Sequence, residues 1–355
     1  MANEPPKLPH ATLNKLLHLV RENTEIYLPL DSRTLLKTPL QVGKEIFSIA
    51  GGQHWYQGIQ NALRNYYQEV TPALDAFKIN LSMDGLPLHN SGGTQFWPIL
   101  MQVHNDPKAE VLVLGAYCGT SKPENAEGYL RPNVTFEGVG RDRTDAEFRS
   151  GIYAGGHQKR PSPVSEFYDL NVILDIVVGD RLHAIDLDVT KKLLKGLVLG
   201  FLPPFPKWSS YEQEEISFLL SKIEIPGEIH RKLRTLKHLT FWKGSEFSIF
   251  LHYARIPILK GRISEKAFYH FTLYYVAITL LSSKVYKQYY TYAGELLKQF
   301  VEEFSKVYGA GHVTSNVHNL LHIAAEVNRF GPLSTFSMYP FENKLKLIKD
   351  CVPKY

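Results

Sequence analysis

Cysteine is the scarcest residue type in this chain of 355 residues: only Cys118 and Cys351 occur, far apart and with no partner at metal-ligand spacing. Two isolated thiols argue against a disulfide framework and against a cysteine-based zinc site, so no zinc is expected. Because disulfide-rich scaffolds belong to oxidising compartments, we expect an intracellular location.

Long hydrophobic runs are also lacking. The longest apolar stretch, around residues 271–281, is shorter than the about 20 residues that cross a bilayer, so no membrane partner is expected. No basic segment followed by an apolar run opens the chain, and a secretory signal is therefore not expected. The net charge of +5 is compatible with a nucleic-acid partner without being diagnostic of one.

Hydrophobic residues make up 44% of the sequence, enough for one large or two ordinary domains. Residues 76–88 alternate apolar and polar side chains and end in Asp84-Gly85, which predicts a strand followed by a turn. Apolar runs at 95–103 and 110–118 predict two further strands. Asp84 could point its carboxylate into a cleft or, as an alternative, cap a hairpin.

The pattern of the rest of the chain predicts mainly helices. Apolar residues recur at helical spacing in 12–21, 55–70, 184–199, 211–223, 245–253, 265–281, 289–308 and 314–328. Residues 119–163 show no confident strand or long helix, and the β-branched run 172–178 predicts a buried strand. A strand-rich first half and a helical second half predict an α+β fold.

Three places could contribute acidic groups to one site: Asp84, the Asp180-x-x-His183 pair after the predicted strand, and Glu342 at the start of the last helix. Carboxylates brought together hold Mg²⁺ or Mn²⁺, which can activate water for phosphodiester cleavage. Each residue also has a structural interpretation: Asp180 as a helix N-cap, His183 as a core histidine, and Glu342 as a favourable helix N-terminal charge.

Basic residues could contact phosphates in two places. Lys191, Lys192 and Lys195 are expected on the outer face of one helix, and Arg231 and Lys232 belong to the basic stretch 230–243. Ion pairs with neighbouring helices are the alternative for that stretch. His318 and His322 share a helical face, but without a third ligand they favour a structural role over a zinc site.

Several longer motifs match a known family in family order. They are LPLDSRTLLKTP, NLSMDGLPLHNSGGTQFWPIL, KPENAEGYLRP, RTDAEFR, HQKRPSPV, DRLHAIDLDVTKKLLKG, LTFWKGSEFSIFLHYARIPILKG, YHFTLYYVAITLLSS and YGAGHVTSNVHNLLHIAAEVNRFGPLSTFSMYPFEN. Together they cover most of the chain, which resembles the invertebrate transposase-like proteins related to CACTA-type (En/Spm) DNA transposases with an RNase H-like core.

The resemblance implies a DDE-type site for metal-dependent cleavage and transfer of DNA strands. Asp84 would match the first carboxylate and Glu342 the last, both as ligands of Mg²⁺ or Mn²⁺, with Asp180-x-x-His183 matching the Asp-x-x-His signature between them. The mild positive charge and the three lysines named above lead us to expect weak DNA binding through phosphates. Self-association is a further possibility, and a nuclear location is expected if the protein is functional. The expected parts are an N-terminal helical region (1–70), an RNase H-like core (71–183), a helical insertion (184–330) and a C-terminal helix completing the core (331–355).

One segment departs from the family pattern. Between KPENAEGYLRP and RTDAEFR the family carries its second catalytic aspartate and a Cys/His knuckle, whereas here only NVTFEGVGRDR joins them. Asp142 and Asp145 match neither position. A triad that lacks one carboxylate holds two metal ions poorly, so we expect impaired catalysis. The alternatives are a non-enzymatic nucleic-acid or protein-binding module that keeps the fold, and a relic whose gene model omits an exon.

Overall fold

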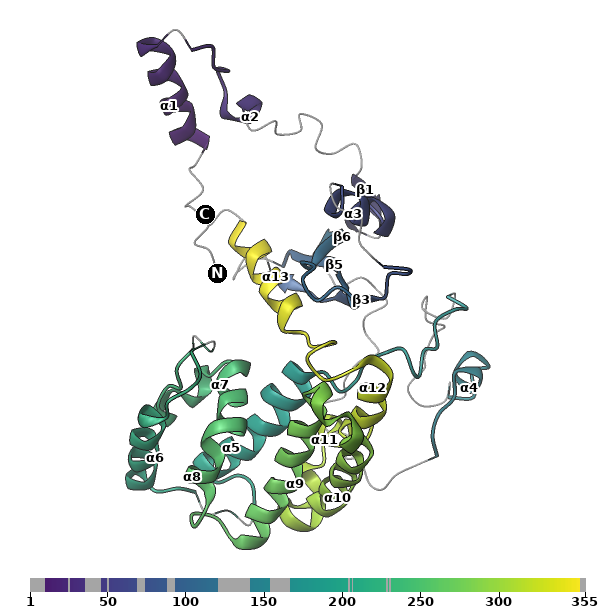
Figure 1. Cartoon of the computed structure of the whole chain (residues 1–355), viewed down its shortest axis with the longest axis vertical. Helices are drawn as coiled ribbons and strands as arrows, with labels where there is room; N and C mark the ends of the chain where they lie inside the picture. Colours follow the sequence, from purple (N-terminus) through teal and green to yellow (C-terminus); the bar gives the residue numbers. More distant parts are fainter. Residues whose placement is uncertain are drawn as a thin grey trace.

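The structure is a computed structural model that describes residues 10–24, 26–35, 46–49, 51–68, 74–87, 93–120, 141–153, 167–203, 205, 207–227, 229 and 231–351. Along the chain come a small helical pair, a sheet and a large helical body (Figure 1). Residues 1–9 and the KPENAEGYLRP and HQKRPSPV motifs lie outside the described residues, as does most of the departing segment. Within 141–153, α4 (Asp145–Arg149) is a single short helix.

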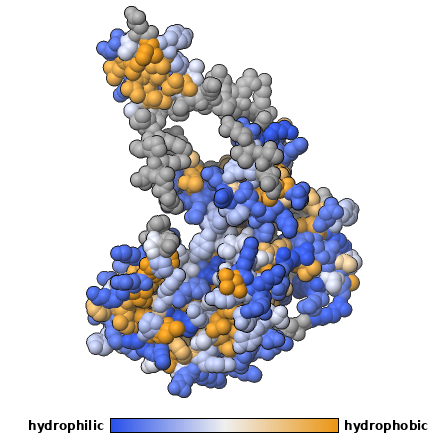
Figure 2. Space-filling model, in the orientation of Figure 1, coloured by the Kyte–Doolittle hydropathy of each residue, from blue (hydrophilic) through white to orange (hydrophobic). Residues whose placement is uncertain are grey.

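The helical pair consists of α1 (His10–Asn23) and α2 (Ser32–Leu35), which confirms the helix predicted at 12–21. The amide of Ser32 donates to Asn14 Oδ1 over 2.6 Å and holds the two helices together. Hydrophobic side chains gather over α1 in Figure 2, among them the exposed Leu16 and Leu19. The pair therefore buries little apolar surface of its own.

The sheet is antiparallel throughout, with strand order β1-β2-β6-β5-β3 and the short β4 also paired to β5. Its strands are β1 (Ile46–Ile49), β2 (Gly52–Tyr56), β3 (Ile79–Met83), β4 (Leu86–Pro87), β5 (Gln95–Val103) and β6 (Leu112–Gly119). The three predicted strands are confirmed as β3, β5 and β6, and Leu81 of β3 pairs with Met101 of β5.

The helix predicted at 55–70 is shorter than expected. Trp55 belongs to β2, where it pairs with Ala116, and α3 spans only Ile59–Tyr66. Gly58 separates strand from helix with a φ of 82°, a conformation that a residue with a side chain adopts at a cost. The aromatic start of the predicted helix therefore continues the sheet instead.

Helices cover both faces of the sheet. Leu100 packs with Phe341 and Leu345 of α13 (Tyr339–Cys351), whereas Met101 packs with Ala62 of α3. Successive residues of a strand point to opposite faces, so α13 and α3 lie on opposite sides. In Figure 1, α13 (yellow) runs from the helical body up to the sheet.

The helical body has one large core. Its elements are η3 (Arg181–Thr190, a π-helix), α5 (Lys191–Leu199), α6 (Ser210–Lys222), η4 (Leu236–Phe241), α7 (Gly244–Ile249), η5 (Phe250–Ala254), α8 (Arg255–Leu259), α9 (Glu265–Leu281), η6 (Lys284–Tyr289), α10 (Tyr290–Tyr308), η7 (Ala310–His312), α11 (Ser315–Asn319) and α12 (Ile323–Phe330). Fully buried aromatic side chains such as Phe247, Tyr274 and Phe300 fill its interior.

Two predicted elements of this part are wrong or altered. The strand predicted at 172–178 is absent: residues 172–176 form turns and bends, in which the side chain of Asn171 accepts the amides of Ile173 and Leu174, and Leu174 and Ile176 are exposed. The helix predicted at 314–328 is broken into α11 and α12. The described part of the basic stretch, residues 231–243, holds the 3₁₀ turn η4, and its other residues have no regular secondary structure.

The α+β prediction is confirmed at the level of a mixed structure with an antiparallel sheet and a separate helical part. The RNase H-like core and the four-part division of the chain stay predictions. None of the helices in the described ranges is long and apolar enough to cross a membrane.

Candidate functional site

Asp180 lies where the chain enters the helical body. It is the N-cap of η3, and its carboxylate accepts the amides of Leu182 (2.9 Å) and His183 (2.7 Å). The same carboxylate accepts the amide of Met338 over 3.0 Å, directly before α13 begins. The N-cap predicted from the sequence is therefore confirmed, and it also ties the start of the helical body to its end.

His183 joins Asp180 to Glu342. Its Nδ1 lies 2.8 Å from Asp180 Oδ2, and its Nε2 lies 3.6 Å from Glu342 Oε1. Hydrogen bonds to these two carboxylates raise the pKa of His183 to about 10, against a smaller opposing effect of burial. Burial favours the neutral form of Asp180, but the bonds from His183 and Met338 hold the pKa of its carboxyl below the usual value. At neutral pH an imidazolium thus lies between two carboxylates.

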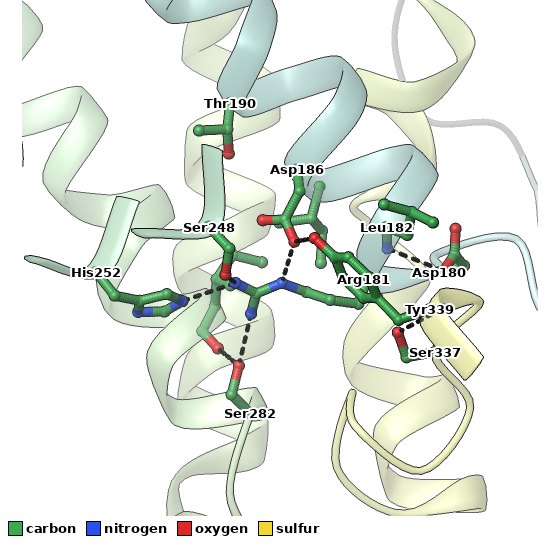
Figure 3. A network of polar contacts seen from close by, with 12 residues as sticks. Asp180, Arg181, Leu182, Asp186, Thr190, Ser248, His252, Ser282, Ser337 and Tyr339 are labelled. Carbon is green, nitrogen blue, oxygen red and sulfur yellow. Dashed lines mark hydrogen bonds and ion pairs between the residues drawn. The ribbon is translucent and has the colours of Figure 1, made fainter. Parts of the chain in front are cut away.

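Arg181, the residue that follows Asp180, is the centre of a buried polar network (Figure 3). Its Nε donates to Asp186 Oδ2 over 2.9 Å, and its Nη atoms donate to Ser282 Oγ (3.1 Å) and Ser248 Oγ (2.7 Å). Nη2 also lies 2.8 Å from His252 Nε2. Burial, together with the charges of Arg181 and Arg255, lowers the pKa of His252 to about 3, so that this ring is neutral and accepts the bond.

Tyr339 links the buried network to α13. Its hydroxyl donates to Asp186 Oδ2 over 2.9 Å. Burial raises the pKa of Asp186, while the Arg181 guanidinium and the Tyr339 hydroxyl stabilise its charged form. The first residue of α13 is therefore fixed to η3 by a buried carboxylate, one turn before Glu342 reaches His183.

Glu326 of α12 supports the same junction from a third element. Its Oε1 accepts the amide of Val178 over 2.7 Å and its Oε2 accepts the amide of Gly179 over 3.0 Å. A methyl group at Gly179 would collide with Ile323 and approach the Glu326 carboxylate. The backbone that precedes Asp180 is thus held by a buried carboxylate, and Glu326 positions the Asp180–His183 pair.

Sequence reasoning missed Arg181, Asp186, Glu326 and Tyr339. Arg181 and Asp186 stand inside the matched motif, but no spacing rule distinguishes a buried ion pair from two exposed charges. Glu326 and Tyr339 act on residues more than a hundred positions earlier in the chain. Only the folded arrangement reveals these roles.

Asp84 follows β3, as expected, and its Oδ1 accepts the amide of Gly85 over 2.7 Å. Asp84 and Gly85 join β3 to β4, which both pair with β5 and not with each other, so the hairpin that Asp84 was expected to cap is not formed by these two strands. Among the described residues, no group of three or more His, Cys, Asp or Glu side chains could hold a metal ion. A shared metal ligand pair of Asp84 and Glu342 stays a prediction.

The Asp180–His183–Glu342 group does not fit a divalent cation. The carboxylate of Asp180 already accepts three backbone amides and the His183 ring. Glu342 faces the His183 imidazolium, whose positive charge would repel a metal ion at that position. These contacts make the group a junction between elements.

The lysines predicted on the outer face of one helix are not equivalent. For Lys192 the prediction of an outer-face position is wrong, because its side chain is only 16% exposed. Its Nζ lies 3.6 Å from Asp188 Oδ1 and donates to Thr314 Oγ1 over 2.6 Å. Lys191 and Lys195 are half-buried. α11 packs against η3, the π-helix directly before this helix, and Thr314 at the N-cap of α11 holds the Lys192 ammonium there.

Arg231 and Lys232 lie in the extended segment before η4. Arg231 Nη1 is 3.7 Å from Glu246, a buried carboxylate that Arg234 also contacts. Lys232 lines a surface pocket together with Lys222 and Glu224. The ion-pair alternative therefore holds for Arg231, and phosphate contacts by either residue stay a prediction.

No protein-family model matches the chain, and no curated protein matches it at a significant level. The family resemblance of the motifs therefore stays a prediction, and the site has to be interpreted from its own geometry.

Proposed function

We propose that the chain derives from a DDE-type DNA transposase and binds DNA weakly without cleaving it. The observation that supports this best is the meeting of Asp180, His183 and Glu342, which the motif resemblance assigns to one site although Glu342 lies far along the chain. The antiparallel strands β6, β5 and β3, with α13 packed on one face, are compatible with the RNase H-like core that the resemblance implies.

The loss of cleavage follows from the electrostatics of the group. Two-metal hydrolysis needs carboxylates that are free to bind cations and a bound water that attacks phosphorus. Here the carboxylates of Asp180 and Glu342 neutralise an imidazolium. Asp84 remains as a candidate ligand, but one free carboxylate is too few to fix a pair of divalent ions.

The test is DNA cleavage by the purified chain with Mg²⁺ or Mn²⁺, on a duplex carrying the terminal repeats of the element from which the gene derives. We expect no cleavage, and DNA binding should remain. Cleavage that disappears in both Asp84→Ala and Glu342→Ala would show that the chain is a working nuclease.

A non-enzymatic binding module is the second candidate, favoured by the fact that the Asp180–His183–Glu342 contacts are fully explained as a junction. Protein capture without any DNA binding at low salt would favour it over the proposal. A transcript that encodes an additional strand and a Cys/His knuckle between residues 132 and 143 would favour the incomplete gene model.

A further inference from the structure

Arg255 is a buried cation that lacks an acidic partner. The residue is only 4% exposed, and its guanidinium carbon lies 3.3 Å from the centroid of the Tyr275 ring on α9. Its Nε is buried without a hydrogen-bond partner, and no ion pair between Arg255 and a carboxylate occurs within the described ranges. The other well-buried arginine of this region, Arg181, has Asp186 beside it.

The neighbours of Arg255 do not neutralise its charge. His252 lies one turn earlier and is neutral, as its contact with Arg181 requires. Tyr275 offers a ring face and a hydroxyl, which stabilise a guanidinium but carry no negative charge at neutral pH. An ionised group removed from water without a counter-charge is unfavourable, so the site favours an anion.

A second unpartnered donor lies on the same face of α9. Thr279 Oγ1 is buried and has no hydrogen-bond partner, and Thr279 follows Tyr275 by one helical turn. The sequence neighbours of Arg255 reach the surface, since Tyr253 is 45% exposed and Ile256 is 50% exposed. Arg255 and Thr279 thus each carry a buried hydrogen-bond donor without a partner.

We propose that Arg255, the first residue of α8, is the base of a binding site for a phosphate group between α8 and α9. A guanidinium donates two parallel hydrogen bonds to an oxyanion, and a phosphate offers further acceptor oxygens for hydroxyl donors such as that of Thr279. The phosphate is either free in solution or the terminal phosphate of a nucleic acid. This site does not include Asp180, His183 or Glu342. A negative result for phosphate binding therefore leaves the proposed function untouched, and a negative result for the proposed function leaves the phosphate site untouched.

The site is tested by thermal unfolding of the full chain at constant ionic strength, with inorganic phosphate replacing chloride. Phosphate binds the folded state and should raise the unfolding temperature of the wild type, with a shift that saturates with concentration. Arg255→Met should abolish this shift, and in phosphate-free buffer it should unfold at the same temperature or higher, because an unpaired buried charge is removed. Lys260→Met removes a neighbouring exposed charge and should keep the wild-type shift.

A 5′-phosphorylated oligonucleotide and its unphosphorylated counterpart distinguish the two sources. A shift with inorganic phosphate assigns the site to free phosphate, and a shift only with the phosphorylated oligonucleotide assigns it to a nucleic-acid end. If Arg255→Met does not fold, Arg255→Lys keeps the charge but loses the paired donors, and should weaken phosphate binding measured by ³¹P NMR. The proposal is overturned if neither inorganic phosphate nor the phosphorylated oligonucleotide raises the unfolding temperature of the wild type. It is also overturned if the Arg255 variants show the same rise as the wild type.

Discussion

The fold changes the protonation state of His183 at neutral pH. It is protonated in the folded chain up to a pKa of about 10, whereas a free histidine has an ordinary pKa of about 6.5. A raised folded pKa contributes stability that is complete below the unfolded value and is lost as the pH rises through the folded value. The Asp180–His183–Glu342 junction should therefore be fully formed at neutral pH.

His183→Gln tests this directly. Because the side chain is 49% exposed, the ion pairs should contribute about 1–2 kcal/mol at pH 6, well below what the pKa shift alone implies. Urea unfolding at pH 6, 8 and 10.5 should show the difference from the wild type shrinking toward alkaline pH. His238→Gln, at an exposed histidine of η4, serves as the control. If the variant's free energy of unfolding is lower than that of the wild type by the same amount at all three pH values, the electrostatic explanation is wrong.

Glu326→Ala should destabilise the chain by about 1–3 kcal/mol, because two backbone amides lose their acceptor in a buried place. Hydrogen exchange at Val178 and Gly179 should accelerate before that of the helical core. Glu326→Gln keeps one acceptor oxygen and should restore part of the protection. Equal exchange in all three proteins would remove the positioning role.

The residues of the junction show what a sequence can and cannot reveal at this scale. Asp180 was predictable as an N-cap because capping is a local event, and Glu342 was predictable as a first-turn charge for the same reason. The bonds from Tyr339 and Glu326 depend on how distant elements pack, so no local pattern contains them.

At the scale of elements, α13 connects the two parts of the molecule. Phe341 faces the sheet, where it is buried beside Leu100, while Tyr339 and Glu342 contact η3. One helix therefore carries both the apolar anchor and the polar contacts, and its detachment would open the junction.

Phe341→Ala should cost about 3–5 kcal/mol, the range for removing a buried aromatic side chain. Leu347 lies on the same helix but is 61% exposed, and Leu347→Ala should stay within about 0.5 kcal/mol of the wild type. Urea unfolding followed by tryptophan fluorescence measures both. Similar losses in the two variants would show that α13 does not anchor through Phe341.

Element types were predictable where the periodicity was long. The helix predicted at 265–281 matches α9 at both ends, and β5 matches its predicted run. Short apolar runs were ambiguous: residues 172–178 are β-branched, but the neighbouring Asn171 side chain captures their amides in turns. Local side-chain bonds of that kind compete with strand formation and leave no periodic signal.

At the scale of the whole molecule, the proposed DNA binding through phosphates should weaken with salt, and the net charge of +5 is compatible with it. Lys191→Ala/Lys195→Ala should lower affinity and reduce the slope of log affinity against log salt by about 1 for each lost contact. Lys192 is left intact, since its bond to Thr314 is structural. Fluorescence anisotropy measures the slope.

Lys298→Ala/Lys306→Ala removes the same charge from exposed positions of α10 and should leave the slope closer to that of the wild type. Equal effects of the two double variants would mean that only net charge matters. Binding that does not respond to salt would contradict the phosphate contacts altogether.

The Asp180 carboxylate joins the start of η3 to Met338, 158 positions after Asp180, because it accepts the amides of both Leu182 and Met338. The chain thus enters the helical body and leaves it at adjacent positions, both held by the Asp180 carboxylate. An insertion with adjacent entry and exit can be lengthened, exchanged or removed with little displacement of its host. If the helical body is the insertion that the sequence predicts, replacing residues 181–337 with a short flexible linker should leave α13 packed on the sheet through Phe341 and Leu345.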